Sequence, residues 1–157
     1  MKTPRLAAFA TLATFATLAC FTLALPAQVH AAPDPLARAA AEKGAVLTDS
    51  GLVYRSLREG DGASPVPSDV VRVHYRGTFP GGREFDSSYK RGEPASFGLE
   101  RVIKCWTEGL QRMKVGGKAK LTCPAALAYG ERGAGSGEIP PNSVLQFEVE
   151  LLGISPR

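Results

Sequence analysis

The side chains that usually perform catalysis are scarce in this sequence. After the first 31 residues the only histidine is His74, which stands in the middle of a β-like stretch without an obvious acid or nucleophile partner. No nucleophile elbow, phosphate-binding glycine loop or metal-type spacing of His and Cys occurs. Residues 133–137 are rich in glycine but do not join a strand to a helix, so they are interpreted as a loop. We therefore expect no metal, no cofactor and no Ser-His-Asp mechanism.

A second group of residues combines aromatic and apolar side chains with a few polar tips. Its members are Tyr75, Phe85, Asp86, Phe97, Val102, Ile103, Trp106, Tyr129 and Phe147. Aromatic residues of a small domain commonly form its core. The two tyrosine hydroxyls and the carboxylate, however, need polar partners or solvent. An apolar hollow with a few polar groups is typical of a small-ligand or peptide site, so both interpretations stay open at this point.

The elements that must position these residues are mostly short strands. Strand patterns cover 52–57, 70–79, 94–98, 117–123 and 143–152. Only one stretch has helical spacing, formed by Ile103, Trp106, Leu110 and Met113 and ending at Gly116-Gly117. Antiparallel strands with one amphipathic helix predict an α+β domain, in which the helix covers one face of a curled sheet.

The first 31 residues are typical of a signal peptide. Lys2 and Arg5 precede an apolar stretch over 6–25, and Val29-His30-Ala31 places small residues at the −3 and −1 positions of a cleavage site. We expect cleavage after Ala31, giving a periplasmic or secreted protein that does not stay in a membrane. An uncleaved anchor and lipid attachment at Cys20 are the alternatives.

The mature chain is expected to have two parts, a short arm over 32–50 and one domain over 51–157. Asp34 could cap a helix running from Pro35 to about Lys43, with Gly44 ending it. The arm is too short to bury a core, so it is a lead-in or a docking segment. Removal of Lys2 and Arg5 leaves 17 of the 19 basic residues against 15 acidic ones, a net charge of +2 that is too weak to indicate nucleic-acid binding.

Six short segments occur in a characteristic order. They are Val73–Gly77, Phe85–Ser88, Val102-Ile103 followed by Trp106, Met113–Gly116, Ala128–Gly130 and Ile139–Pro141. Together they resemble the FKBP family, whose members bind tacrolimus-type macrolides and isomerise X-Pro bonds. The resemblance covers about residues 50–153, and the short arm is similar to that of bacterial secreted members.

The resemblance implies a fold and a set of roles. The fold is a five- to six-stranded antiparallel sheet curled around one short α-helix, with Trp106 as the floor of a pocket between them. The implied catalytic residues are Asp86, Tyr129, Trp106, Phe97 and Phe147, and the implied substrate-binding residues are Tyr75, Phe85, Val102 and Ile103. The Ile103 N–H and the Tyr129 hydroxyl would bind ligand carbonyls. The implied partners are X-Pro segments of exported proteins and tacrolimus-type macrolides.

The chemistry of X-Pro rotation suits such a pocket. The barrier of about 20 kcal/mol is crossed without breaking a bond, so neither a nucleophile nor a metal is required. A dry aromatic pocket favours the twisted amide over the planar, better-hydrated one. We expect a monomeric isomerase; the alternative is a chaperone-like module that holds Pro-containing or unfolded segments with little turnover.

Two features depart from the family pattern. Ala95 stands where many members have a further pocket aromatic, and the loop from Tyr129 to Ile139 is one residue longer, rich in glycine and without the histidine often found there. Both changes are expected to thin the pocket rim.

Two cysteines, Cys105 and Cys123, remain after the signal peptide. An even pair in an exported protein indicates a disulfide, and closing a loop of about 19 residues would stabilise the fold by about 3 kcal/mol. Two buried free thiols are the alternative.

Overall fold

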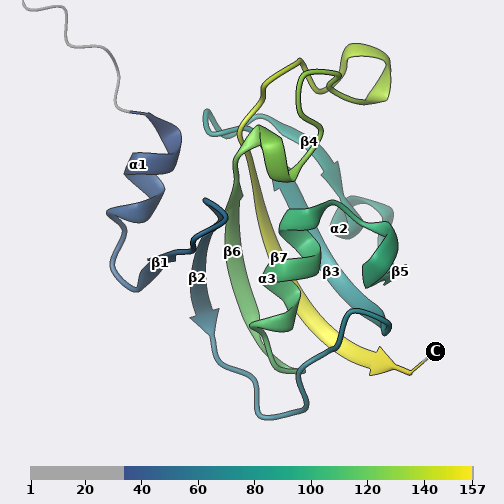
Figure 1. Cartoon of the computed structure of the whole chain (residues 1–157). Coiled ribbons are helices and arrows are strands. Elements are labelled where there is room, and N and C mark those ends of the chain that lie inside the picture. Colours follow the sequence, from purple (N-terminus) through teal and green to yellow (C-terminus); the bar gives the residue numbers. More distant parts are fainter. Residues whose placement is uncertain (1–33, 157) are drawn as a thin grey trace, which may run out of the picture. The chain divides into compact units, whose positions relative to one another are not determined.

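The computed structural model describes residues 34–156, which are shown in colour in Figure 1. The predicted signal peptide and its cleavage site lie outside the described residues. Within the described part of the chain, no helix is both long enough and apolar enough to cross a membrane.

The described residues build one antiparallel sheet. Its strands are β1 (Ala45–Leu47), β2 (Val53–Arg58), β3 (Val70–Thr78), β4 (Glu84–Ser87), β5 (Ala95–Gly98), β6 (Lys118–Cys123) and β7 (Leu145–Ser155). The strand order is β1-β2-β6-β7-β3-β4, and β5 pairs with the first half of β3 while β4 pairs with its end. The predicted α+β fold is confirmed. The sheet has seven strands between residues 34 and 156, more than the five or six expected, and one of them, β1, comes from the predicted arm.

Strand alternation separates an inner from an outer face of the sheet. Along β7, Leu145, Phe147, Val149 and Leu151 are buried, as the alternating sequence predicts. Their neighbours Gln146, Glu148 and Glu150 are only partly buried and lie on the outer face. The inner face therefore carries the hydrophobic core, which the central strands and α3 share.

Three α-helices flank this sheet in residues 34–156: α1 (Pro35–Ala40), α2 (Ser88–Arg91) and α3 (Lys104–Gln111). Helix α3 lies on one face of the sheet and packs against β6 (Figure 1). Its Trp106 and Leu110 are buried there. It ends at Gln111, and Met113 is buried in the turn that follows. The four-residue α2 is too short to produce a helical pattern in the sequence.

Helix α1 is shorter than the sequence predicts. It ends at Ala40 instead of about Lys43, and the Asp34 side chain makes no capping hydrogen bond. Gly44 has a φ of +78°, so the left-handed turn into β1 is placed at this glycine. Contacts of α1 with β1, β2 and β6, together with the burial of Ala39, show that this segment packs onto the sheet.

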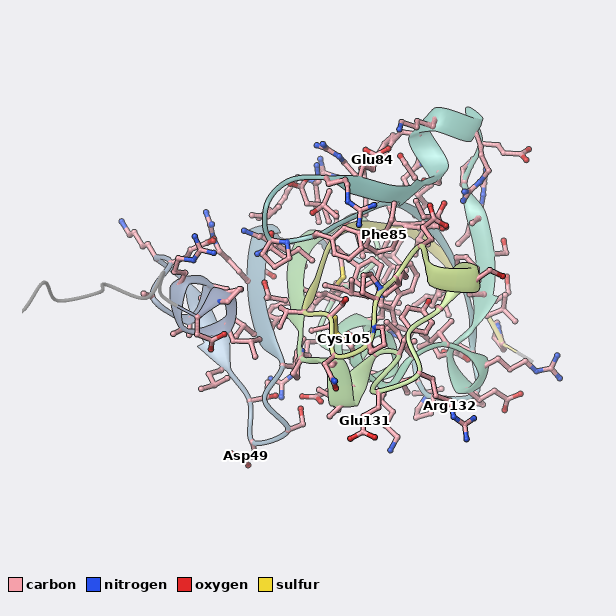
Figure 2. The ribbon with its side chains drawn as sticks, turned by 90° about the horizontal axis from the view of Figure 1, so that it is seen from above. Asp49, Glu84, Phe85, Cys105, Glu131 and Arg132 are labelled. Atoms are coloured by element: carbon pink, nitrogen blue, oxygen red, sulfur yellow. A yellow bond between two sulfur atoms is a disulfide. The ribbon has the colours of Figure 1, made fainter. Side chains whose placement is uncertain are left out.

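A disulfide joins α3 to the end of β6. Cys105 and Cys123 are 18 residues apart and have a Cα–Cα distance of 5.8 Å, within the usual range. Both residues are fully buried, and Figure 2 shows Cys105 in the interior of the domain. The predicted disulfide is confirmed, and it fixes the helix that carries Trp106 to the centre of the sheet.

Candidate functional site

One pocket, with a volume of about 300 Å³, opens between α3 and the inner face of the sheet. The structure brings all nine residues of the aromatic and apolar set to this pocket and adds Arg101. The lining residues are Tyr75, Phe85, Asp86, Phe97, Arg101, Val102, Ile103, Trp106, Tyr129 and Phe147. Their individual roles remain predictions.

Each wall of the pocket comes from a different element. The middle of β3 supplies Tyr75, β4 supplies Phe85 and Asp86, β5 supplies Phe97, and β7 supplies Phe147. The 3₁₀ turn η1 (Leu99–Arg101) leads into Val102 and Ile103 just before α3 begins. Residues from strands that are distant in sequence therefore converge because β3 is shared by β4, β5 and β7.

Trp106 forms the floor of the pocket. Three aromatic rings meet its indole edge-on, with centroid distances of 5.1 Å for Tyr75, 5.5 Å for Phe97 and 5.5 Å for Phe147. Edge-to-face pairs of this kind add stability beyond the burial of area. The indole Nε1 is buried and has no hydrogen-bond partner within residues 34–156. The interlocked rings give a rigid apolar floor.

Phe85 closes one side of this aromatic cluster. Its ring meets Phe147 edge-on at 5.6 Å and Phe79 at 5.3 Å. Figure 2 labels Phe85 among the inward-pointing side chains. The close approach of Phe85 to β3 requires Gly77, because a Cβ at that position would lie 2.6 Å from the Phe85 ring.

The carboxylate of Asp86 forms a hydrogen-bonded triad with Tyr75 and Arg91. Tyr75 donates its hydroxyl hydrogen to Asp86, and Arg91 of α2 donates to both of them, at 2.5 Å to Asp86 and 2.9 Å to the Tyr75 oxygen. Burial disfavours the ionised form of Asp86, but the hydrogen bonds from Tyr75 and Arg91 outweigh it and lower its pKa. Asp86 is therefore a carboxylate at neutral pH.

Both tyrosines of the pocket keep their protons at neutral pH. Burial raises the pKa of Tyr75, and its hydrogen bond to Asp86 adds to this rise. Burial also raises the pKa of Tyr129, helped by the negative charge of Asp86. Tyr129 is 39% exposed, and its hydroxyl makes no hydrogen bond within the described part of the chain. It is a free donor at the pocket mouth.

A second free donor belongs to Ile103, another lining residue of the pocket. No protein acceptor for the backbone N–H of Ile103 is found within residues 34–156. An N–H next to an apolar floor is suited to bind a carbonyl oxygen of a ligand. Together with the Tyr129 hydroxyl, it gives the pocket two hydrogen-bond donors that a peptide could use.

Sequence reasoning missed Arg91 and Arg101. Arg91 lies five residues after Asp86, on the short helix α2 that was not predicted. A carboxylate placed among aromatic residues requires a cation nearby, and this requirement could have pointed to Arg91. Arg101 directly precedes Val102, but an exposed arginine is part of no hydrophobic pattern from which its place in the pocket could be predicted.

Neither Ala95 nor residues 130–139, where the sequence departs from the family pattern, line the pocket. Ala95 packs partly buried against the core from β5, opposite Val73. In the glycine-rich loop, Ala134 and Ile139 exchange two backbone hydrogen bonds of 3.0 Å, so the loop turns back on itself. Figure 2 shows Glu131 and Arg132 of this loop pointing away from Phe85.

His74 is engaged outside the pocket. Its ring stacks on Tyr89 at 4.6 Å, and Nδ1 lies 3.0 Å from the Ser88 hydroxyl. Ser88 is fully buried and also bonds the Tyr75 backbone, so this contact braces β3 against α2. Within residues 34–156 no group of three or more potential metal ligands occurs.

Comparison with known proteins gives the same family at the level of sequence and of structure. The model of the family described as "FKBP-type peptidyl-prolyl cis-trans isomerase" matches residues 62–152. The FKBP-type peptidyl-prolyl cis-trans isomerase FkpA of Aeromonas hydrophila is 55% identical over 119 residues, which is 76% of this chain and 44% of that protein. FkpA of Escherichia coli K12 is 54% identical over 117 residues, covering 74% and 43% of the two chains.

Comparison with solved structures gives the same family as comparison of sequences. The crystal structure of FkpA from Escherichia coli aligns with a TM-score of 0.74 at 51% identity, over 77% of this chain and 56% of that one. The crystal structure of AtFKBP13 aligns with a TM-score of 0.65 at 39% identity, over 71% and 98%. This chain thus spans less than half the length of the curated FkpA proteins that it matches.

Proposed function

Because this chain belongs to the family of FKBP-type peptidyl-prolyl cis-trans isomerases, we propose that it accelerates rotation about X-Pro bonds. The observation that carries the proposal is the pocket of about 300 Å³, in which an aromatic floor is combined with two unpaired donors. It contains a surface for a proline ring and donors for the neighbouring carbonyls.

The apolar surface provides most of the rate enhancement in this proposal. A twisted amide loses resonance and some charge separation, so it is less dependent on water than the planar amide. Burial against Trp106, Phe97 and Phe147 therefore stabilises the transition state more than the ground state. Each 1.4 kcal/mol, roughly, by which the pocket stabilises the transition state more than the ground state increases the rate about tenfold.

The polar groups orient the peptide. The Ile103 N–H and the Tyr129 hydroxyl bind backbone carbonyls on either side of the X-Pro bond. Asp86, held by Tyr75 and Arg91, keeps the Tyr75 ring in place at the pocket wall. No atom of the protein forms a covalent bond with the substrate.

We further propose that the protein acts outside the cytoplasm as a monomer of residues 32–157, with 1–31 removed, 32–50 as arm and 51–157 as isomerase domain. The signal-like N-terminal sequence and the buried disulfide support this assignment. Its partners would be X-Pro segments of exported proteins. The N-terminal residue of the protein from the producing cell, read by mass spectrometry, tests the cut after Ala31, and light scattering tests the monomer.

The isomerase proposal is tested by cis-to-trans relaxation of an Ala-Leu-Pro-Phe peptide with purified 32–157, with and without tacrolimus. Acceleration that tacrolimus blocks is the expected result and places the reaction in this pocket. Acceleration without inhibition would keep the isomerase and remove macrolide binding. No acceleration by a folded sample would overturn the proposal and leave a binding module for Pro-containing segments.

A further inference from the structure

Two charged side chains, Asp86 and Arg101, line the pocket. They differ in how the protein neutralises them. Asp86 is bound by Tyr75 and Arg91 within the triad described above, so its charge is already compensated. Arg101 is 73% exposed at its side chain, and its ion pair is with the adjacent Glu100 at 3.6 Å, itself 45% exposed.

The ion pair with Glu100 leaves Arg101 available to a ligand. Pairs between two exposed side chains are worth little, because water screens the charges and ordering the side chains costs entropy. Glu100 does not line the pocket, whereas Arg101 does. At 3.6 Å the contact between Arg101 Nε and Glu100 is longer than a hydrogen bond, so the donor fork of the guanidinium stays available to a carboxylate of a bound peptide.

The backbone that carries Arg101 is fixed although its side chain is exposed. Leu99, two residues earlier in η1, is fully buried. Its N–H bonds the Asp69 carbonyl at 3.0 Å, and its carbonyl accepts the Thr107 hydroxyl at 2.7 Å. The backbone that carries Arg101 is therefore fixed beside the pocket, which Arg101 and Ile103 both line.

We propose that Arg101 makes this pocket prefer X-Pro segments with a carboxylate side chain next to the proline. The proposal rests on the isomerase function. Arginine suits this task because its planar donor fork can bind both oxygens of a carboxylate. A bound glutamate would leave the aromatic floor free for the proline ring, so the charge would add selectivity without altering the chemistry.

The test compares peptides that differ in one side chain. Ala-Glu-Pro-Phe and Ala-Gln-Pro-Phe carry the change before proline, and Ala-Ala-Pro-Glu and Ala-Ala-Pro-Gln carry it after proline. Exchange spectroscopy by NMR gives kcat/KM for each peptide relative to its uncatalysed rate. Mature wild type should favour one Glu peptide over its Gln partner roughly threefold to tenfold at low salt, and less at high salt. The pair that shows the preference locates the carboxylate.

The variant Arg101→Gln should lose this preference, so that its ratio of kcat/KM for Glu over Gln peptides falls to about one. Arg132→Gln is the matched control, because Arg132 is exposed on the glycine-rich loop and does not line the pocket. Equal rates for Glu and Gln peptides in wild type, or a preference that survives in Arg101→Gln, would overturn the proposal. Failure to accelerate any peptide would instead refute the isomerase function. In that case NMR titration with the same peptides still decides whether Arg101 selects the carboxylate.

Discussion

At the scale of single residues, the pocket combines aromatic rings with a few polar side chains. Trp106 packs edge-to-face with Tyr75, Phe97 and Phe147. All of these rings are buried except Phe97, which is partly buried against the core. Asp86 and Tyr129 are more exposed and contact the pocket from its rim. This arrangement favours the rings as the source of catalysis and the rim as the source of orientation.

The double variant Tyr129→Phe plus Asp86→Ala tests this division. We expect it to retain measurable turnover, with kcat/KM lowered roughly tenfold, equivalent to about 1.4 kcal/mol of transition-state stabilisation. The measurement is peptide isomerisation, with circular dichroism to verify the fold. The control Tyr89→Phe plus Asp49→Ala makes the same chemical changes outside the pocket and should act as wild type. A folded but fully inactive double variant would assign catalysis to the polar tips.

Gly77 shows how closely the pocket wall is packed. A Cβ there would lie 2.6 Å from the Phe85 ring and 3.1 Å from the Phe147 ring. Gly77→Ala should therefore cost about 1–3 kcal/mol of stability and lower kcat/KM several-fold, because Phe85 must move. Thermal unfolding and isomerisation measure the two effects. Gly153→Ala, with open space at its Cβ, is the control; equal behaviour of the two variants would contradict the prediction.

At the scale of elements, the arm is attached to the outer face of the sheet by charge as well as by packing. Glu42 accepts hydrogen bonds from Arg55 of β2 and from Lys120 of β6, the latter at 2.8 Å. The hydrogen bond from Lys120 lowers the pKa of Glu42 most, and the bond from Arg55 adds to it against the opposing effect of burial. One carboxylate thus joins the segment after α1 to two strands.

The substitution Glu42→Gln should weaken this attachment in a pH-dependent way. Because the folded pKa is lowered, the stabilisation is fully present above the ordinary value of 4.5 and is lost as pH falls through the folded value. We expect a difference in unfolding free energy from wild type of about 1 kcal/mol at pH 7. Urea titrations between pH 7 and pH 3 should show the difference shrinking. A constant difference over this range would rule out the ionised Glu42 as its source.

Elements with a clear hydrophobic period were predictable from the sequence. Elements that depend on contacts with residues far away in the sequence were not. The alternation in β7 and the helical spacing of Trp106 and Leu110 reflect burial on one face, which sequence records directly. Strand β1 has three residues and forms because it pairs with β2, so no local sequence pattern predicts it. Arg91 reaches Asp86 because the single helical turn of α2 follows β4 directly, and this turn was not predicted. Seven of the nine pocket residues lie in the six family-like segments, and the other two, Phe97 and Phe147, lie in predicted strands.

At the scale of the whole molecule, the disulfide connects the pocket floor to the sheet. Cys105 precedes Trp106 in α3, and Cys123 ends β6 beside the β7 strand that carries Phe147. A cross-link over this separation restricts the unfolded chain, and in the folded chain it limits movement of α3 away from the sheet. Stability and pocket geometry are thereby linked through one bond.

The double variant Cys105→Ala plus Cys123→Ala should unfold with a free energy lower by about 3 kcal/mol. The peptide activity of its folded fraction should fall less than its stability, because the aromatic cluster remains packed. Urea unfolding of wild type with and without reductant provides the comparison, and the variant should not respond to reductant. Identical urea curves for oxidised wild type and variant would show that the bond does not stabilise the fold.

The burial of both cysteines also sets an order of events in biosynthesis. Neither sulfur is accessible once α3 has closed on β6, so an oxidant must act while the chain is still open. The proposed isomerase would in this way depend on an oxidant for its own maturation. The same gene expressed in a reducing and in an oxidising compartment would yield two proteins of different stability, one without and one with the disulfide. The free thiol content of each preparation must therefore be measured before preparations are compared.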